Sequence, residues 1–169
     1  MKTTSCIVLI LITGIISSCN QIRFNSPLPS AGEPQLNVPE ELRGSFVGMD
    51  LKNDTLLFDS LQLRRSSEKK AYSIGKDLII KKVGNKFFIN VNTEHWELGI
   101  ATQLNNTTWQ LETFAFDPED PNPFITDIKK IMKLTSLKSG DYLANPTDRQ
   151  LEKVLISNPL PSSLFEKVN

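Results

Sequence analysis

Apolar and polar residues alternate along three consecutive segments in the middle of the chain. In residues 86–91, Phe87, Ile89 and Val91 alternate with Lys86, Phe88 and Asn90, and the segments around Trp96 and Trp109 repeat the pattern. An alternation of period two is typical of antiparallel strands that place one face against a core. The sequence therefore predicts antiparallel β-structure for the middle of the chain.

Turn residues divide the predicted strands. Gly84-Asn85 separates residues 78–83 from the first alternating segment, and Asn105-Asn106 separates the two segments that contain tryptophan. Both pairs tolerate positive φ, which a two-residue hairpin requires. Two further strands are expected in residues 44–49 and 56–63, which gives an up-and-down meander of about six strands.

The pattern becomes helical after Phe116. Asn122-Pro123 is typical of a helix start, and this helix is expected to stop near Lys130, because residues 133–146 also fit a small hairpin around Ser139-Gly140. Thr147 and Gln150 predict a capping box for a second helix, which ends at residues 157–159. We expect an α+β fold, an antiparallel β-meander followed by two short C-terminal helices. The sheet is either curved and covered by the helices or closed into a small, partly open barrel.

The N-terminus has the composition of an export signal. Lys2 precedes an apolar stretch, Ile7 to Ile16, of about 10 residues, half the length that a membrane-spanning helix needs. The only cysteines are Cys6 and Cys19. The rest of the chain therefore has no disulfide, thiolate nucleophile or cysteine metal ligand.

The four residues Ile16-Ser17-Ser18-Cys19 resemble the lipobox of bacterial lipoproteins. The resemblance implies that residues 1–18 are removed as a signal peptide and that Cys19 is lipidated with acyl chains such as palmitate. The alternatives are an ordinary signal peptide cut near Ser18, or a buried core segment. Asn20 is not the aspartate that retains lipoproteins at the inner membrane of enteric bacteria. The resemblance therefore implies a cell-envelope protein on the outer membrane, facing the periplasm.

Four prolines, among them Pro27 and Pro39, interrupt the segment that follows the lipobox. This segment has neither helical nor strand periodicity, so residues 19–39 are predicted to be the lipidated cysteine and a flexible linker. The alternative is that the segment packs on the domain. A single β-rich domain with the C-terminal helices is expected over residues 40–169.

The balance of charges and the few candidate catalytic residues argue against several classes of function. Lysine plus arginine and aspartate plus glutamate number 19 each, so nucleic acid is not an expected partner. His95 is the single histidine and no G-x-S-x-G motif occurs. Glu94 and Glu97 do not define a glycosidase cleft. We therefore predict no catalytic residue, no metal and no cofactor.

Several clusters allow a second interpretation. One group consists of the carboxylates and the amide that follow Phe116, which are Asp117, Glu119, Asp120 and Asn122. These residues either provide oxygen ligands for calcium or place negative charge next to the start of a helix, where the helix dipole favours it. A group of basic residues faces either anionic lipid or solvent; these are Arg64, Arg65, Lys69, Lys70, Lys81 and Lys82. Aromatic residues on both strand faces indicate that both faces are partly covered, by core packing or by a bound peptide or lipid.

Two short motifs indicate glycosylation. Asp54-Thr55-Leu56 and Asp59-Ser60-Leu61 resemble the Asp-(Ser/Thr)-aliphatic O-glycosylation motif of secreted Bacteroidetes proteins. The resemblance implies that Thr55 and Ser60 carry glycans and that the lipoprotein is of the Bacteroidetes type.

Together these features predict a membrane-anchored envelope lipoprotein. Its partners are the membrane, through the lipid on Cys19, and another envelope protein. Because the sequence contains few candidate catalytic residues, we favour a non-catalytic binding or assembly component. The alternatives are an inhibitor or immunity-type protein that acts on a periplasmic enzyme, and a hydrolase that uses His95 with a serine or a carboxylate.

Overall fold

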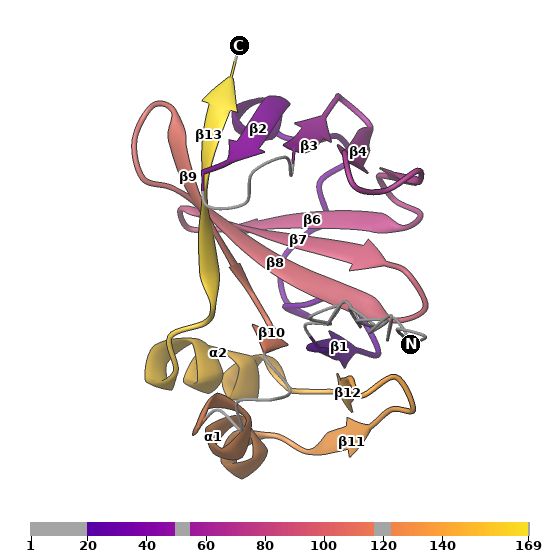
Figure 1. The fold of residues 1–169 in the computed structure, drawn as a ribbon, viewed down its shortest axis with the longest axis vertical. Helices are drawn as coiled ribbons and strands as arrows, with labels where there is room; N and C mark the ends of the chain where they lie inside the picture. The colour runs from indigo at the N-terminus through magenta and orange to yellow at the C-terminus, as the bar shows by residue number, and fades with distance from the viewer. Residues whose placement is uncertain (1–19, 50–54, 117–122, 169) are drawn as a thin grey trace, which may run out of the picture.

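The computed structural model describes residues 20–49, 55–116 and 123–168 of the 169-residue chain. The fold is mostly-β α+β: a large, mixed, open sheet of 13 strands in the described residues, with two short helices near the C-terminus (Figure 1). The elements are β1 (Asn20–Phe24), a 3-10 turn (Glu40–Leu42), β2 (Gly44–Gly48), β3 (Thr55–Phe58), β4 (Gln62–Arg65), β5 (Ala71–Ser73), β6 (Leu78–Val83), β7 (Lys86–Asn92), β8 (Trp96–Gln103), β9 (Thr108–Thr113), β10 (Ala115–Phe116), α1 (Pro123–Ile131), β11 (Leu134–Ser136), β12 (Tyr142–Ala144), α2 (Asp148–Ser157) and β13 (Ser162–Val168).

Two antiparallel meanders, β2–β5 and β6–β9, form most of the sheet. The last strand, β13, joins them by pairing with β9 on one side and β2 on the other, with Phe165 opposite both Trp109 and Gly48. The sheet curls until β5 and β6 approach each other at one isolated bridge, Ile74 to Leu78. The curl encloses an apolar interior.

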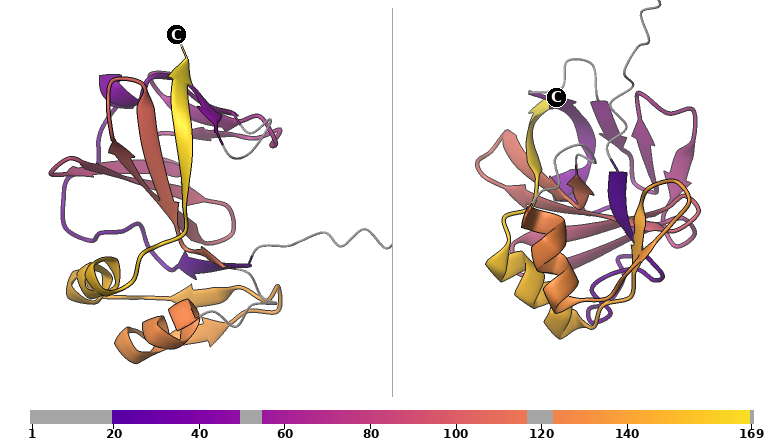
Figure 2. Two further views of the ribbon diagram at one scale, coloured as in Figure 1. Left: turned by 60° about the vertical axis from the view of Figure 1, so that its left-hand side comes forward. Right: turned by 60° about the horizontal axis from the view of Figure 1, so that its bottom comes forward.

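A second layer lies at one end of the molecule. It contains α1, α2 and the β11–β12 hairpin, and β1 connects it to the main sheet, as both views of Figure 2 show. β1 runs parallel to β12, with Ile22 opposite Tyr142, and meets β8 at Phe24 and Trp96. The parallel pair makes the sheet mixed, whereas the sequence predicted purely antiparallel strands.

Both faces of β7 and β8 are buried, as the aromatic pattern indicated. Phe88 and Ile100 face a helix-side core, which also contains residues of α1 and α2. Phe87 and Ile89 face a sheet-side core inside the curl, where Trp109 packs edge-on against Phe46. Side chains of this protein therefore supply the covering on each face.

The prediction of a free linker is wrong for residues 20–39. Ile22 and Phe24 of β1 are each 1% exposed, and Leu28 and Val38 are also buried. The segment lacks periodicity because its backbone is irregular beyond β1. Its buried residues there are single side chains, separated by exposed ones, that pack into the cores. The alternative considered for this segment, packing on the domain, describes it correctly.

The number of strands also exceeds the prediction of about six. The expected strand 56–63 is divided into β3 and β4 because the Asp59 carboxylate accepts hydrogen bonds from the backbone N–H groups of Leu61 and Gln62 and forms a turn. The C-terminal strand β13 was not expected from the sequence.

Several local predictions are confirmed. Gly84, at φ +61°, and Asn85 form a two-residue turn between Val83 and Lys86. The β11–β12 hairpin forms as expected, and α2 begins with the Thr147–Gln150 capping box. The turn at Asn105-Asn106 is longer than two residues, because β8 ends at Gln103 and β9 begins at Thr108.

Candidate membrane-anchoring site

The predicted lipidation site lies directly next to the fold. Cys19 is outside the described residues, and Asn20, which follows it, is the first residue of β1. Asn20 pairs with Phe116 of β10, and its Nδ2 donates to the carbonyl oxygen of Gly140 in the β11–β12 turn at 3.1 Å. The candidate site is therefore this end of β1 together with the hairpin beside it.

An ionic network fastens β1 to its neighbours. Arg23 Nε donates to Asp141 Oδ2, and its Nη1 donates to Glu97 Oε1, both at 2.7 Å. The second oxygen of Asp141, Oδ1, accepts from the backbone N–H of Gln21 at 2.9 Å. Because Asp141 is 7% exposed, water screens these bonds little.

Hydrogen bonds also hold the chain that follows β1 against the domain. Asn90, which is fully buried on β7, accepts from Leu28 N–H at 2.7 Å and donates to the Leu28 carbonyl at 2.8 Å. The buried Lys81 donates to the Pro29 carbonyl at 2.6 Å. The Asp148 carboxylate, at the start of α2, accepts from the N–H groups of Ser30 and Ala31. The main sheet and α2 thus both hold the segment that was expected to be a tether.

Asp141→Asn is expected to lower the free energy of unfolding by about 2 kcal/mol at neutral pH, because it breaks a charge-assisted bond to Arg23. Burial alone raises the pKa of Asp141, but the bonds from Gln21 N–H and Arg23 more than offset it and hold the pKa below 3.8. The carboxylate therefore stabilises the fold above pH 3.8 and loses this contribution as the pH falls through the lowered pKa. Urea titrations across this range should show the difference from wild type shrinking in acid.

Asp127→Asn is the control for that experiment. Asp127 pairs with Lys130 on the surface of α1, and such exposed pairs contribute less than about 1 kcal/mol. A difference for Asp141→Asn that stays constant with pH would contradict the ionic network.

The two predicted glycosylation sites flank β3, at the end of the molecule opposite β11 and β12. Thr55 is half-buried at the start of β3, and Ser60 is exposed in the β3–β4 turn. Asp54 of the first motif lies outside the described residues. Ser60 is therefore the more accessible of the two hydroxyl groups.

Intact mass spectrometry of the protein from its native host tests these sites. We expect a mass increase of sugar size that is reduced in Ser60→Ala and absent when Thr55→Ala is added, since each hydroxyl is the only attachment atom of its motif. Ser66→Ala, on a neighbouring exposed residue outside such a motif, serves as the control. An unmodified wild-type mass would contradict the glycosylation hypothesis.

The other candidate residues do not form a reactive centre in the described part of the chain. His95 is half-buried in the turn before β8, and its ring makes no hydrogen bond with a described residue. Glu97 is bound to Arg23 and Thr93, whereas Glu94 is exposed. No group of three or more metal-ligating side chains occurs in residues 20–49, 55–116 or 123–168. Asp117, Glu119, Asp120 and Asn122, the calcium candidates, lie outside these ranges.

The predicted basic group is divided among separate interactions. Lys81 is buried, Lys82 pairs with Glu41 at 2.8 Å, and Lys70 pairs with Asp77 at 3.4 Å. Lys81 therefore cannot contribute to a lipid-facing surface, and carboxylates already compensate the charges of the other two lysines. None of the described helices has the length and apolar character that crossing a bilayer requires.

The hollows lined by described residues include a small apolar cavity and a larger cleft. A cavity of about 30 Å³ inside the sheet-side core is lined by apolar side chains and Trp109, whose Nε1 has no hydrogen-bond partner. This volume holds about one water molecule and is too small for an acyl chain. A cleft of about 370 Å³ lies between α1 and the segment that leads into β13, with Phe124 and Asn158 in its wall.

No family model matches this chain, and no curated protein and no solved structure matches it either.

Sequence reasoning did not find Arg23, Asp141 and Asn90. Arg23 lay within the expected linker, and Asp141 and Asn90 are single polar residues in short strands or turns, without a motif around them. Asn90 did carry a signal, since it interrupts the apolar residues of a strand that is otherwise buried on both faces.

Proposed function

We propose that this protein is a cell-envelope lipoprotein, anchored through Cys19 to the outer membrane and facing the periplasm. Its folded domain acts as a non-catalytic binding or assembly component. One acyl chain binds membranes weakly and reversibly, whereas two or three chains on one cysteine hold a protein stably.

The observation that carries the proposal is the position of the lipobox relative to the fold. The motif ends at Cys19, and the strand β1 begins at the next residue. Cleavage before Cys19 would leave every residue from Asn20 onwards available to the domain. Cleavage within β1 would instead remove residues that the helix-side core needs, such as Ile22.

An exposed apolar patch supports the binding role. Val47, Met49, Leu57 and Val168 are 36–55% exposed and point outwards from β2, the chain beyond it, β3 and β13. Figure 1 shows these strands at the opposite end of the molecule from β11 and β12. Exposed apolar patches are typical of protein interaction sites, and an anchor on Cys19 would leave this one facing away from the membrane.

Cys19→Ala is expected to abolish acylation and to leave a full-length precursor, because the thiol is the acceptor of the lipid. Membrane fractionation combined with intact mass measurement reads both outcomes. Cys6→Ala is the matched control, since Cys6 lies in the predicted signal peptide and should leave processing unchanged. A Cys19→Ala protein that is cleaved normally and stays in the membrane fraction would refute the anchor.

A further inference from the structure

The anchor position defines which surface of the domain meets the membrane, so this inference rests on the proposed lipidation of Cys19. One residue extends the chain by at most about 3.6 Å. A lipid attached to Cys19 would therefore lie close to Asn20. Asn20 is itself bound to Gly140. The β11–β12 turn therefore lies beside the point where the chain would enter the headgroup layer.

The domain cannot move away from the bilayer by releasing β1. Ile22 and Phe24 are each 1% exposed within the helix-side core, and Arg23 is bound to both Glu97 and Asp141. Release of the strand would expose both apolar side chains and break both ion pairs. The domain is consequently held against the membrane with no flexible linker between them.

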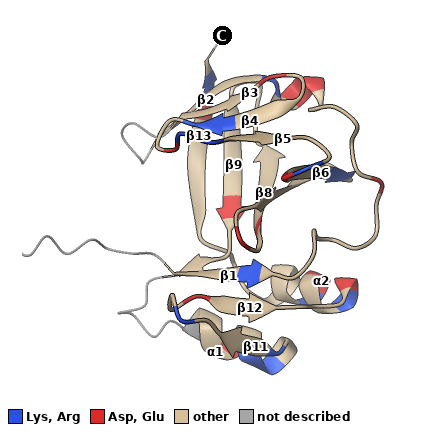
Figure 3. Ribbon diagram, turned by 90° about the vertical axis from the view of Figure 1, so that its right-hand side faces the viewer, with Lys and Arg blue, Asp and Glu red and all other residues tan. Residues whose placement is uncertain are grey.

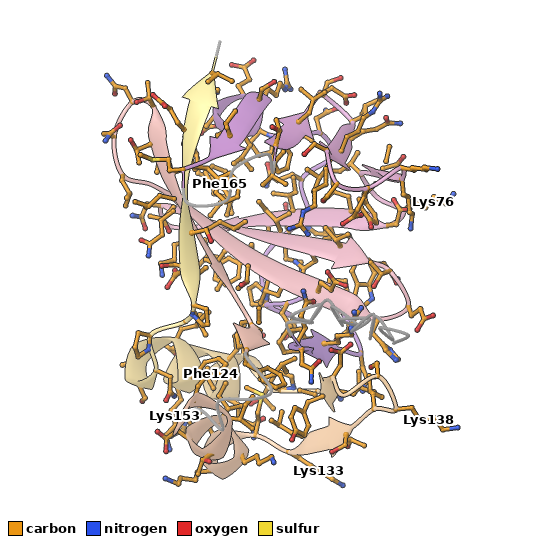
Figure 4. The ribbon with its side chains drawn as sticks, in the orientation of Figure 1. Lys76, Phe124, Lys133, Lys138, Lys153 and Phe165 are labelled. Atoms are coloured by element: carbon orange, nitrogen blue, oxygen red, sulfur yellow. The ribbon has the colours of Figure 1, made fainter. Side chains whose placement is uncertain are left out.

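Three lysines lie at this end of the domain. Lys138 is exposed in the turn, two residues before Gly140, and Lys133 is exposed directly before β11. Lys129 of α1 lies over the ring of Tyr142, at 4.7 Å, and Tyr142 pairs with Ile22 of β1. Figure 3 shows basic segments on this layer, and Figure 4 shows Lys133 and Lys138 projecting from it.

The carboxylate in the hairpin does not compensate these lysines. Asp141 is bound to Arg23 and Gln21, and neither Lys133 nor Lys138 makes an ion pair with a described residue. Lys129 contacts only the Tyr142 ring and its hydroxyl among the described residues. Within the described part of the chain, no carboxylate therefore neutralises these three ammonium groups.

We infer that Lys129, Lys133 and Lys138 form a membrane-docking face that binds the phosphates of anionic lipid headgroups beside the anchor. Each lysine near an anionic leaflet gains roughly 1 kcal/mol, which is about a fivefold change in occupancy. The lipid on Cys19 supplies the attachment, and this face sets the orientation. It directs the exposed apolar patch of β2, β3 and β13 away from the bilayer.

The test compares lysine reactivity within one protein. The acylated wild-type protein is placed in vesicles of phosphatidylglycerol and phosphatidylcholine and, separately, in detergent micelles. A water-soluble amine reagent then labels the lysines, and peptide mass spectrometry reads each rate. The internal controls are two exposed lysines, Lys69 on the β4–β5 turn and Lys76 on the β5–β6 turn. Figure 4 labels Lys76.

Lys129, Lys133 and Lys138 should react about fivefold more slowly in these vesicles than in micelles, while the controls do not change. In vesicles of phosphatidylcholine alone the protection should disappear. Equal rates for all five lysines in a protein that sediments with the vesicles would overturn the docking face and leave the anchor intact. If these three lysines are already protected in micelles and the protection rises with protein concentration, the face binds a second copy of the protein and not lipid. A protein without acyl mass would overturn both proposals.

Discussion

Phe24→Ala is expected to lower the free energy of unfolding by about 3–5 kcal/mol, which is a large part of the stability of a domain of this size. Phe24 is 1% exposed, and its ring packs edge-on against Phe114 at 5.2 Å between centroids. Removal of the ring leaves a cavity in the helix-side core that the surrounding strands cannot fill. Urea unfolding followed by tryptophan fluorescence measures the change.

Leu36→Ala is the matched control for that variant. Leu36 lies in the same N-terminal segment but is 87% exposed, so its truncation should change stability by less than about 0.5 kcal/mol. If Phe24→Ala and Leu36→Ala unfold at the same urea concentration as the wild type, β1 is not part of the cooperative fold. The segment would then be a tether after all, and the docking face would lose its basis.

Asn90→Leu is expected to destabilise the domain by about 3 kcal/mol or more. The carboxamide of Asn90 is fully buried and satisfies both the N–H and the carbonyl oxygen of Leu28. Leucine has the same branched shape but cannot form these bonds, so two buried backbone groups lose their partner, at about 1–3 kcal/mol each. Thermal and urea unfolding measure the loss.

Asn92→Leu, two residues further along β7, is the control for this effect. The Asn92 side chain is half-buried and makes no hydrogen bond with a described residue. A small change in Asn92→Leu together with a large one in Asn90→Leu would show that the cost arises from the Leu28 bonds. Equal changes would instead indicate a general intolerance of leucine in this strand.

The correct predictions concern features that neighbouring residues determine. The Gly84-Asn85 turn formed because glycine adopts φ +61° without strain. The Thr147–Gln150 capping box formed because both of its hydrogen bonds lie within one helical turn. The segments predicted as strands from residue 86 onwards do form β7, β8 and β9, although β7 is buried on both faces and its burial does not follow a period of two.

The missed elements depend on partners that are distant in the chain. Gln21 bonds to Asp141 across 120 residues, so nothing near β1 indicates that it is a strand. β13 has one buried side chain, Phe165, and its position between β9 and β2 follows from pairing on both edges. In the candidate site, the sequence proposed Cys19, whereas the three lysines beside it are scattered over ten residues of α1 and the β11–β12 hairpin.

The sequence alone predicted the strand character of the central segments and the limits of the helices, and the anchor on Cys19 is proposed from the sequence. Each of these is encoded within a few consecutive residues. The tertiary structure decided that residues 20–39 pack on the domain, that β13 joins the two meanders and that Lys129, Lys133 and Lys138 lie on the layer next to Asn20. The physical reason is that burial and strand pairing join residues without regard to their separation in the chain, so these arrangements exist only once the cores have formed.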